Sequence, residues 1–180
     1  ASDVYKRQVQ NQYGGFVYAG ATMAFTTAYW VLGHYNPREI AFLGCDMSYH
    51  KSSKTHFYGT GTADPLREDI TLISLEAKAA RLYALALAQG CEITNLSQET
   101  SRLIAPRRSL LEPRPEPFEI DKVQKAHALA REQELAYYVA SGRYWEELER
   151  FDIEQIKRLD ALWSNVVIEP KEAAALMRGY

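Results

Sequence analysis

The sequence predicts an α/β fold, namely a truncated Rossmann-like domain with a mainly parallel sheet and flanking helices, followed by a helical C-terminal tail. Segments with apolar residues at helical spacing alternate with short apolar runs that are typical of buried strands. A long polar and glycine-rich segment separates two of these units, and such segments are usually functional. Beyond a proline-rich stretch, the composition changes to charged amphipathic helices. These observations divide the chain into residues 1–8, 9–111, 112–120 and 121–180.

The first eight residues are not expected to be native. Ala1 to Gln8 match, residue for residue, the in-frame translation of an adapter used in transposon-based sequencing libraries. Adapter-derived residues are excluded from fold reasoning. We therefore expect native sequence to begin near Val9, in the middle of a reading frame, as in a metagenomic fragment. The sheet of such a fragment would have an exposed edge near Val9.

Residues 9–111 alternate between the two kinds of element. Apolar residues between Phe25 and Leu32 have helical spacing, and Gly33 is expected to end that helix. Gly90 is expected to end a second, longer helix. The expected elements, in order, are a strand ending at Tyr18, a helix over 22–33, a strand over 39–44, a loop over 47–69, a helix over 70–89 and a strand over 91–95.

The C-terminal part begins with an extended, proline-spaced linker over residues 112–120. Two charged amphipathic helices follow, over 121–150 and 152–166, with Asp121 and Asp152 as N-caps. This helical tail is rich in Tyr and Trp. Aromatic residues at such density usually pack onto the main domain or onto a partner, so we expect the tail to mediate packing or self-assembly.

Composition excludes several classes of protein. A formal net charge of -2 gives no sign of nucleic-acid binding. No apolar run reaches the length of a membrane span, so we expect no transmembrane segment. Cys45 and Cys91 lie in apolar runs without metal-ligand spacing, which predicts buried free thiols in the reducing cytoplasm.

Polar residues follow three predicted strands, at the sheet edge where ligands of open α/β sheets bind. Gly20 and Thr22 would present helix N-terminal amides to a phosphate or carboxylate, or Thr22 would simply cap its helix. Asp46 would accept hydrogen bonds from a sugar or ribose hydroxyl, or would cap its own loop. Asn95 stands at the end of the third predicted strand.

The long loop contains the most specific motif, Thr55-His56-Phe57-Tyr58-Gly59. A histidine flanked by aromatic residues suits general acid–base catalysis, because its unperturbed pKa is about 6.5. The alternative for His56 is a solvated surface residue. His50 and His56 lack a third metal ligand at convincing spacing, so we expect no metal site.

These residues together resemble a bacterial family. The chain is similar, from about Gly14 to Arg107, to the DUF115/MptE-like proteins and to the related family 42 bacterial sialyltransferase-like glycosyltransferases. The resemblance is carried by Gly14-Gly15, Tyr18 to Thr22, Ala28, Leu32-Gly33, Glu39 to Asp46, Tyr49, His56 to Gly59 and Gly90 to Asn95.

The resemblance implies a nucleotide-sugar donor, a glycan acceptor and no further cofactor. It makes His56 the general base that deprotonates the acceptor hydroxyl. Tyr49 would hold the phosphate of the departing nucleotide, and the remaining donor contacts would come from Gly20, Thr22, Asp46, Tyr58 and Asn95. Two departures matter: the lid that the sialyltransferases insert before the His motif is missing, and their nucleotide-binding first half would lie upstream of Val9. The fragment alone is therefore expected to be inactive.

Two alternatives stay open. In the pterin diphosphokinase branch of the same relatives, pyrophosphate is transferred to a hydroxyl with Mg²⁺, which Asp46 and Asp64 would hold. In the other alternative the chain is a non-catalytic α/β domain whose aromatic helical tail mediates assembly.

Overall fold

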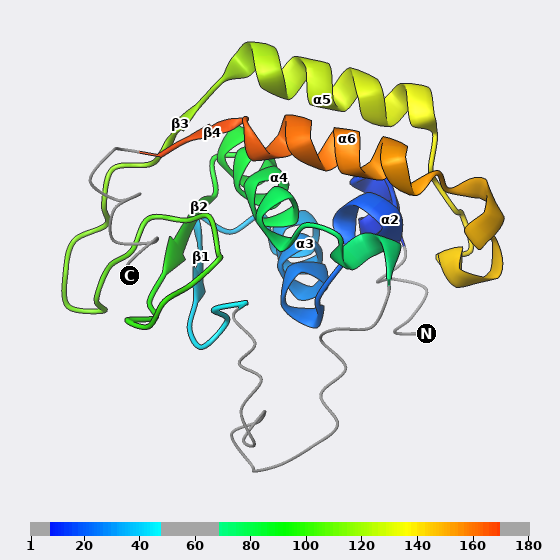
Figure 1. Cartoon of the computed structure of the whole chain (residues 1–180). Helices are drawn as coiled ribbons and strands as arrows, with labels where there is room; N and C mark the ends of the chain where they lie inside the picture. Colours follow the sequence, from blue (N-terminus) through cyan, green and yellow to red (C-terminus); the bar gives the residue numbers. More distant parts are fainter. Residues whose placement is uncertain (1–7, 48–68, 170–180) are drawn as a thin grey trace, which may run out of the picture.

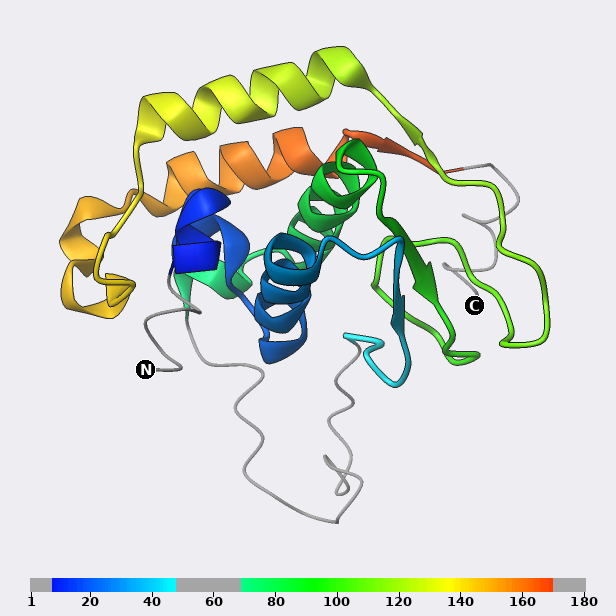
Figure 2. The same ribbon diagram turned by 180° about the vertical axis from the view of Figure 1, so that it is seen from behind.

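A computed structural model describes residues 8–47 and 69–169. Most of the segment predicted to derive from an adapter, residues 1–7, lies outside this range. The described chain is a mixed α/β structure with a helical layer over a small parallel strand pair (Figures 1 and 2). Its helices and strands are, in order, α2 (Phe16–Ala19), α3 (Met23–Tyr35), β1 (Glu39–Phe42), α4 (Leu75–Ala88), β2 (Glu92–Asn95), β3 (Glu119–Ile120), α5 (Lys122–Leu135), α6 (Ile153–Ser164) and β4 (Val167–Ile168).

The predicted strand before Gly20 is wrong, since these residues form the short helix α2. Gly15, with φ of 84°, turns the chain, and its carbonyl accepts the Ala19 amide at 2.8 Å. The expected sheet edge near Val9 is also wrong. Residues 8–12 are helical and Val9 is buried.

Helix α3 begins as predicted and ends later than predicted. The Thr22 hydroxyl caps it by accepting the Phe25 amide at 3.3 Å. The helix continues through Gly33 and ends at Tyr35, because the next residue, Asn36, adopts a left-handed conformation. Gly33 is required for close packing, because a Cβ there would lie 2.6 Å from Cγ1 of Val9.

The parallel sheet has two strands in the described part of the chain. β1 pairs in parallel with β2, with Glu39 opposite Glu92 and Phe42 opposite Asn95. β3 and β4 form a separate antiparallel pair, so the expected mainly parallel sheet is reduced to one parallel and one antiparallel pair.

Helix α4 is the centre of the molecule (Figure 1). A 3-10 turn at Ile70–Leu72 precedes it, so the predicted helix over 70–89 starts only at Leu75, with Ser74 as N-cap. Gly90, with φ of 76°, follows its end as predicted. Because α4 is alanine-rich, its neighbours approach closely on most sides. One core lies between α3, α4 and the parallel pair, and another lies between α2, α4, α5 and α6.

The tail helices pack on this centre. Tyr137, Tyr144 and Trp163 are buried, which confirms that aromatic residues of the tail pack onto the main domain, whereas Tyr138 and Trp145 are exposed. Asp121 and Asp152 cap α5 and α6 as predicted.

Two boundaries in the C-terminal part differ from the prediction. The predicted helix over 121–150 stops at Leu135, because Ala136 turns into the left-handed region; two 3-10 turns follow, at Tyr144–Glu146 and Leu148–Arg150. The predicted linker ends in ordered structure, since Phe118 is buried and Glu119–Ile120 pairs with Val167–Ile168.

Candidate functional site

The carboxyl ends of β1 and β2 form one edge of the structure. The two strands run side by side, and the Leu96 amide donates to the Phe42 carbonyl at 2.8 Å just beyond them. The N-termini of α3 and α4 lie toward the same end (Figures 1 and 2). Helix N-termini carry unpaired amides and a partial positive charge, so this edge is suited to an anionic group.

The loops after the two strands are tied to each other. The Gly44 amide donates to Oγ of Ser97 at 3.0 Å, and the Arg102 amide donates to the carbonyl of Asp46 at 2.8 Å. The structure therefore brings Asp46, which is half-buried, together with the segment that follows Asn95. The sequence predicted that Asp46 and Asn95 share this edge.

Asn95 shapes the edge from inside the protein. It is buried, its Nδ2 donates to Oγ of Ser101 at 3.1 Å, and its Oδ1 accepts the Ser97 amide at 2.9 Å. Its backbone amide donates to the Pro106 carbonyl at 2.8 Å. These bonds fold residues 96–107 back along β2.

Gly20 and Thr22 have structural roles at the start of α3. A Cβ at Gly20 would lie 2.3 Å from the Phe16 carbonyl oxygen, so only glycine fits the turn between α2 and α3. Thr22 is the N-cap described above. The capping interpretation of Thr22 is thus what the geometry shows.

Three predicted site residues, His56, Tyr49 and Tyr58, lie outside the described residues, as do His50 and Asp64. The segment that contains them leaves from Met47, which is buried, and returns at Asp69. The Asp69 carboxylate is held by hydrogen bonds: its Oδ1 accepts the Thr71 amide at 2.8 Å and the Thr71 hydroxyl at 2.7 Å, and its Oδ2 accepts the Tyr144 hydroxyl at 2.7 Å.

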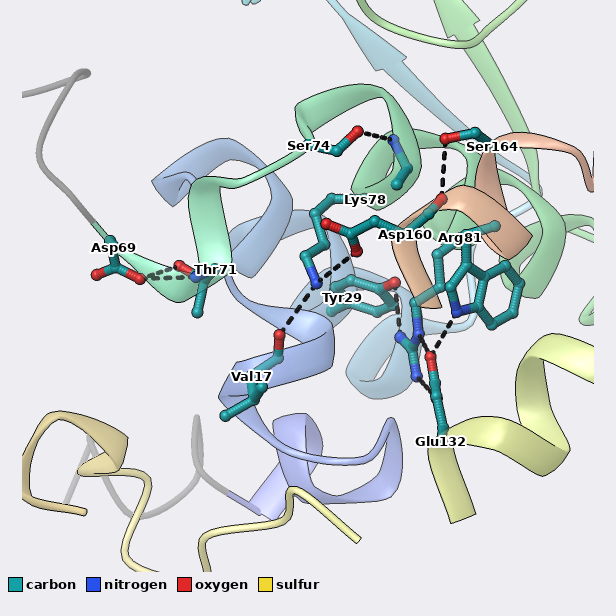
Figure 3. Close-up of polar contacts among 12 residues, drawn as sticks. Val17, Tyr29, Asp69, Thr71, Ser74, Lys78, Arg81, Glu132, Asp160 and Ser164 are labelled. Atoms are coloured by element: carbon teal, nitrogen blue, oxygen red, sulfur yellow. Dashed lines mark hydrogen bonds and ion pairs between the residues drawn. The ribbon is translucent and has the colours of Figure 1, made fainter. Parts of the chain in front are cut away.

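A buried ionic cluster between α4 and the tail was not predicted (Figure 3). Arg81 makes a bidentate pair with Glu132, with Nε–Oε1 at 2.6 Å and Nη2–Oε2 at 2.8 Å, and the two side chains are 3% and 7% exposed. Nη1 donates to the Tyr29 hydroxyl at 2.8 Å, and Nη2 donates to the Tyr13 carbonyl at 2.7 Å. Trp163 completes the cluster, its Nε1 donating to Glu132 Oε1 at 2.7 Å.

A second buried pair lies beside it. Lys78 Nζ is 3.4 Å from Asp160 Oδ1 and donates to the Val17 carbonyl at 3.2 Å (Figure 3). Burial raises the pKa of the Asp160 carboxyl group, and the Lys78 ammonium opposes that shift. Lys78 thereby joins α2, α4 and α6.

The cluster fixes the protonation of its members. Burial raises the pKa of the Tyr29 phenol to about 12, so this hydroxyl stays neutral. Burial alone would lower the pKa of the Arg81 guanidinium. The Glu132 carboxylate and the Tyr29 hydroxyl have a larger effect and raise that pKa. Each guanidinium nitrogen of Arg81 donates to a protein acceptor. The Arg81–Glu132 pair, here called the clamp, thus links α4 to α5.

A pocket of about 480 Å³ opens beside the clamp, between the N-terminal segment, α4 and α5. Tyrosine rings, glutamine amides and leucines supply most of its wall. The lining residues are Gln12, Tyr13, Gly14, Tyr18, Arg81, Leu85, Gln89, Leu129, Glu132, Gln133, Ala136 and Tyr138. Burial also raises the pKa of the Tyr18 phenol to about 12, so the pocket offers neutral hydroxyls and amides around a charge-balanced ion pair.

The sequence contained one signal for this cluster. Lys78 and Arg81 interrupt an otherwise alanine- and leucine-rich helix, and a cation in a helix that is apolar all round needs a buried partner. The identity of that partner could not be predicted, because Glu132 lies 51 residues away in a charged helix.

Neither the comparisons with known proteins nor the search for metal ligands identifies a function for the chain. Comparison with protein-family models, with curated proteins and with solved structures gives no significant match. Within residues 8–47 and 69–169, no three His, Cys, Asp or Glu side chains gather in a way that could hold a metal ion. In the same ranges both cysteines are free, and no helix is long and apolar enough to cross a membrane.

Proposed function

We propose that the chain is part of a Rossmann-like, nucleotide-sugar-dependent glycosyltransferase. One observation carries the proposal: α4 lies between two parallel strands in the chain, and the carboxyl ends of these strands lie toward the same end of the molecule as the N-termini of α3 and α4 (Figures 1 and 2). Open α/β sheets bind ligands at such an edge. The donor phosphate would lie near the helix N-termini, and Asp46 would accept a hydrogen bond from a ribose or sugar hydroxyl.

The chemistry would belong to the segment between Met47 and Asp69, which follows Asp46 at this edge. His56 would take the proton of the acceptor hydroxyl while that oxygen bonds to the anomeric carbon of the donor sugar. The bond between this carbon and the phosphate oxygen breaks, and the nucleotide leaves with that oxygen. Tyr49 and Tyr58 would hold the leaving phosphate, and Gly20, Thr22 and Asn95 would keep the backbone of the donor site in place.

The test uses the full-length protein that contains this segment, assayed for sugar transfer from nucleotide-sugar donors to glycan acceptors. The His56→Asn substitution removes the proposed base, so kcat should fall roughly 10²- to 10⁴-fold with little change in the KM for the donor. His34→Asn is the matched control, because His34 is exposed and stacks on Trp30 with ring centroids 5.0 Å apart.

Wild-type turnover by His56→Asn on a confirmed substrate would exclude His56 as the base. Absence of nucleotide binding by the full-length protein would exclude the transferase itself. Turnover that survives chelation separates this proposal from a Mg²⁺-dependent diphosphokinase.

A further inference from the structure

Two consecutive arginines line a small pocket beyond the end of β2. Arg107 pairs with Asn95 in an isolated parallel bridge, and the Arg108 amide donates to the Asn95 carbonyl at 3.1 Å. The pocket has a volume of about 300 Å³, and its remaining lining residues are Gln98, Ser109 and Glu112. It therefore lies next to the strand edge and is separate from the pocket beside Arg81.

Arg107 has hydrogen-bond capacity that the described residues leave unused. Its Nη1 donates to the carbonyls of Ser97 at 3.1 Å and Glu99 at 2.7 Å. Its Nε and Nη2 are shielded from solvent and have no hydrogen-bond partner among the described residues. No carboxylate in the described ranges lies within ion-pair distance of its guanidinium.

The neighbouring arginines differ from Arg107 in having carboxylate partners, although Nε of Arg108 is also shielded without a hydrogen-bond partner. Arg108 Nη2 lies 2.7 Å from Oε1 of Glu39, and Arg102 Nε lies 2.5 Å from Oε1 of Glu76. Arg114 contacts both Glu39 and Glu92. A shielded cation without a counterion is costly, and a bound anion would remove that cost.

A carboxylate of the chain already lies at this pocket. Oε2 of Glu112 accepts the Ser109 amide at 2.9 Å, and the Glu112 carbonyl accepts Arg108 Nη1 at 3.4 Å. Within the described residues Glu112 makes no ion pair. The Ser109 amide is thus directed at an anionic oxygen, which an incoming ligand could replace.

We infer that this pocket binds a phosphate-sized oxyanion, with Arg107 as counterion and the Ser109 amide as hydrogen-bond donor. Arginine suits the task, because its planar guanidinium presents paired N–H groups to phosphate oxygens. The inference rests on this geometry and does not require the proposed transferase activity. The source of the oxyanion is either free phosphate or the phosphate of a nucleotide.

The test measures binding of inorganic phosphate to the chain by calorimetry and by the rise in melting temperature that a bound ligand produces. Arg107→Gln should weaken phosphate binding about tenfold or more, since it removes the charge of a charge-assisted hydrogen bond. Glu112→Gln should strengthen it about fivefold, because a competing negative charge is lost while the Ser109 amide keeps an acceptor. Arg114→Gln is the matched control and should change nothing, since that side chain is 47% exposed and paired elsewhere.

Binding of neither phosphate nor uridine monophosphate up to about 10 mM would overturn the inference. Unchanged affinity in Arg107→Gln would overturn it as well. If Arg107→Gln does not fold, Glu112→Gln decides, because unchanged affinity in that variant is incompatible with an anion beside its carboxylate.

A comparison of probes identifies the source. Tighter binding of uridine monophosphate than of phosphate, with no binding of uridine, assigns the site to a nucleotide. Equal binding of phosphate and uridine monophosphate assigns it to free phosphate. Both results support the oxyanion site, and the transferase proposal is tested separately by sugar transfer.

Discussion

Cys45 and Cys91 show how strongly position changes the chemistry of one residue type. Cys91 is fully buried, and burial together with the nearby Glu39 and Glu92 carboxylates raises the pKa of its thiol to about 11. Cys45 is half-buried, and burial and Asp46 raise the pKa of its thiol. The reactive species is the thiolate, so exposure and pKa together set the reaction rate.

We therefore expect a native-state thiol titration at pH 8 with a disulfide reagent to modify Cys45 first. Cys91 should react only when the chain is unfolded in guanidinium. The variant Cys45→Ser should abolish the fast phase, and Cys91→Ser should leave it unchanged. Two fast-reacting thiols in the folded protein would contradict the burial of Cys91.

For single residues, roles that depend on neighbours in the sequence could be predicted, and roles that depend on distant segments could not. Thr22, Asp121 and Asp152 were recognisable as caps, because a cap bonds amides two or three residues away. The prediction that Gly33 ends its helix is wrong, because this glycine is required by the Val9 side chain, which lies in another segment. Asn95 was placed at the right edge, but its bonds to Ser97 and Ser101 depend on how the following loop folds back.

One buried ion pair joins α4 to α5. Arg81 and Glu132 are both buried, and breaking a buried pair leaves an uncompensated charge. The pair also holds Trp163 and Tyr29, so its loss would leave several donors without acceptors.

Single substitutions in this pair should be strongly destabilising. We expect Glu132→Gln and Arg81→Met each to lower the free energy of unfolding by about 3–5 kcal/mol, measured by urea denaturation. The double variant Arg81→Met/Glu132→Leu should lose less than the sum, because no charge remains buried.

Glu154→Gln supplies the control for that experiment. Glu154 pairs with Lys157 on the surface of α6, and both side chains are more than half exposed. Such a pair contributes about 0.5 kcal/mol or less. If Glu132→Gln costs no more than Glu154→Gln, the clamp does not hold α5 on α4.

The ends of helices and strands could also be predicted where local residues determine them, but not where distant contacts do. The C-terminal end of α4 was predicted to within a residue or two, because Gly90 marks it locally. The helix expected over 121–150 was interrupted instead, because Tyr137 and Tyr144 turn inward to pack in the core. The strand expected before Gly20 formed a helix, since the chain between Gly15 and Gly20 bonds to itself rather than to a neighbouring strand.

At the scale of the whole molecule, the fold class was predictable and the sheet was not. Alternating apolar patterns indicated α/β, and the structure has one parallel pair joined through α4. The sequence did not show that residues 118–169 share a core with residues 8–47 and 69–117, because a composition change at the prolines resembles a domain boundary. Phe118 packs against Tyr83, and its amide donates to the Tyr83 hydroxyl at 2.7 Å.

A chain that ends after Pro117 should therefore lose cooperative unfolding. Lys78 and Arg81 would lose Asp160 and Glu132, and the face of α4 that includes Ala77 and Ala84 would face water. We expect the shortened chain to keep helical far-UV circular dichroism but to bind hydrophobic dyes and show no sharp urea transition. Adding residues 118–169 as a separate peptide should restore the transition, since the same contacts can form between two chains. A shortened chain that unfolds with the midpoint and slope of the full chain would show that the tail is an appendage and that α4 is stable without it.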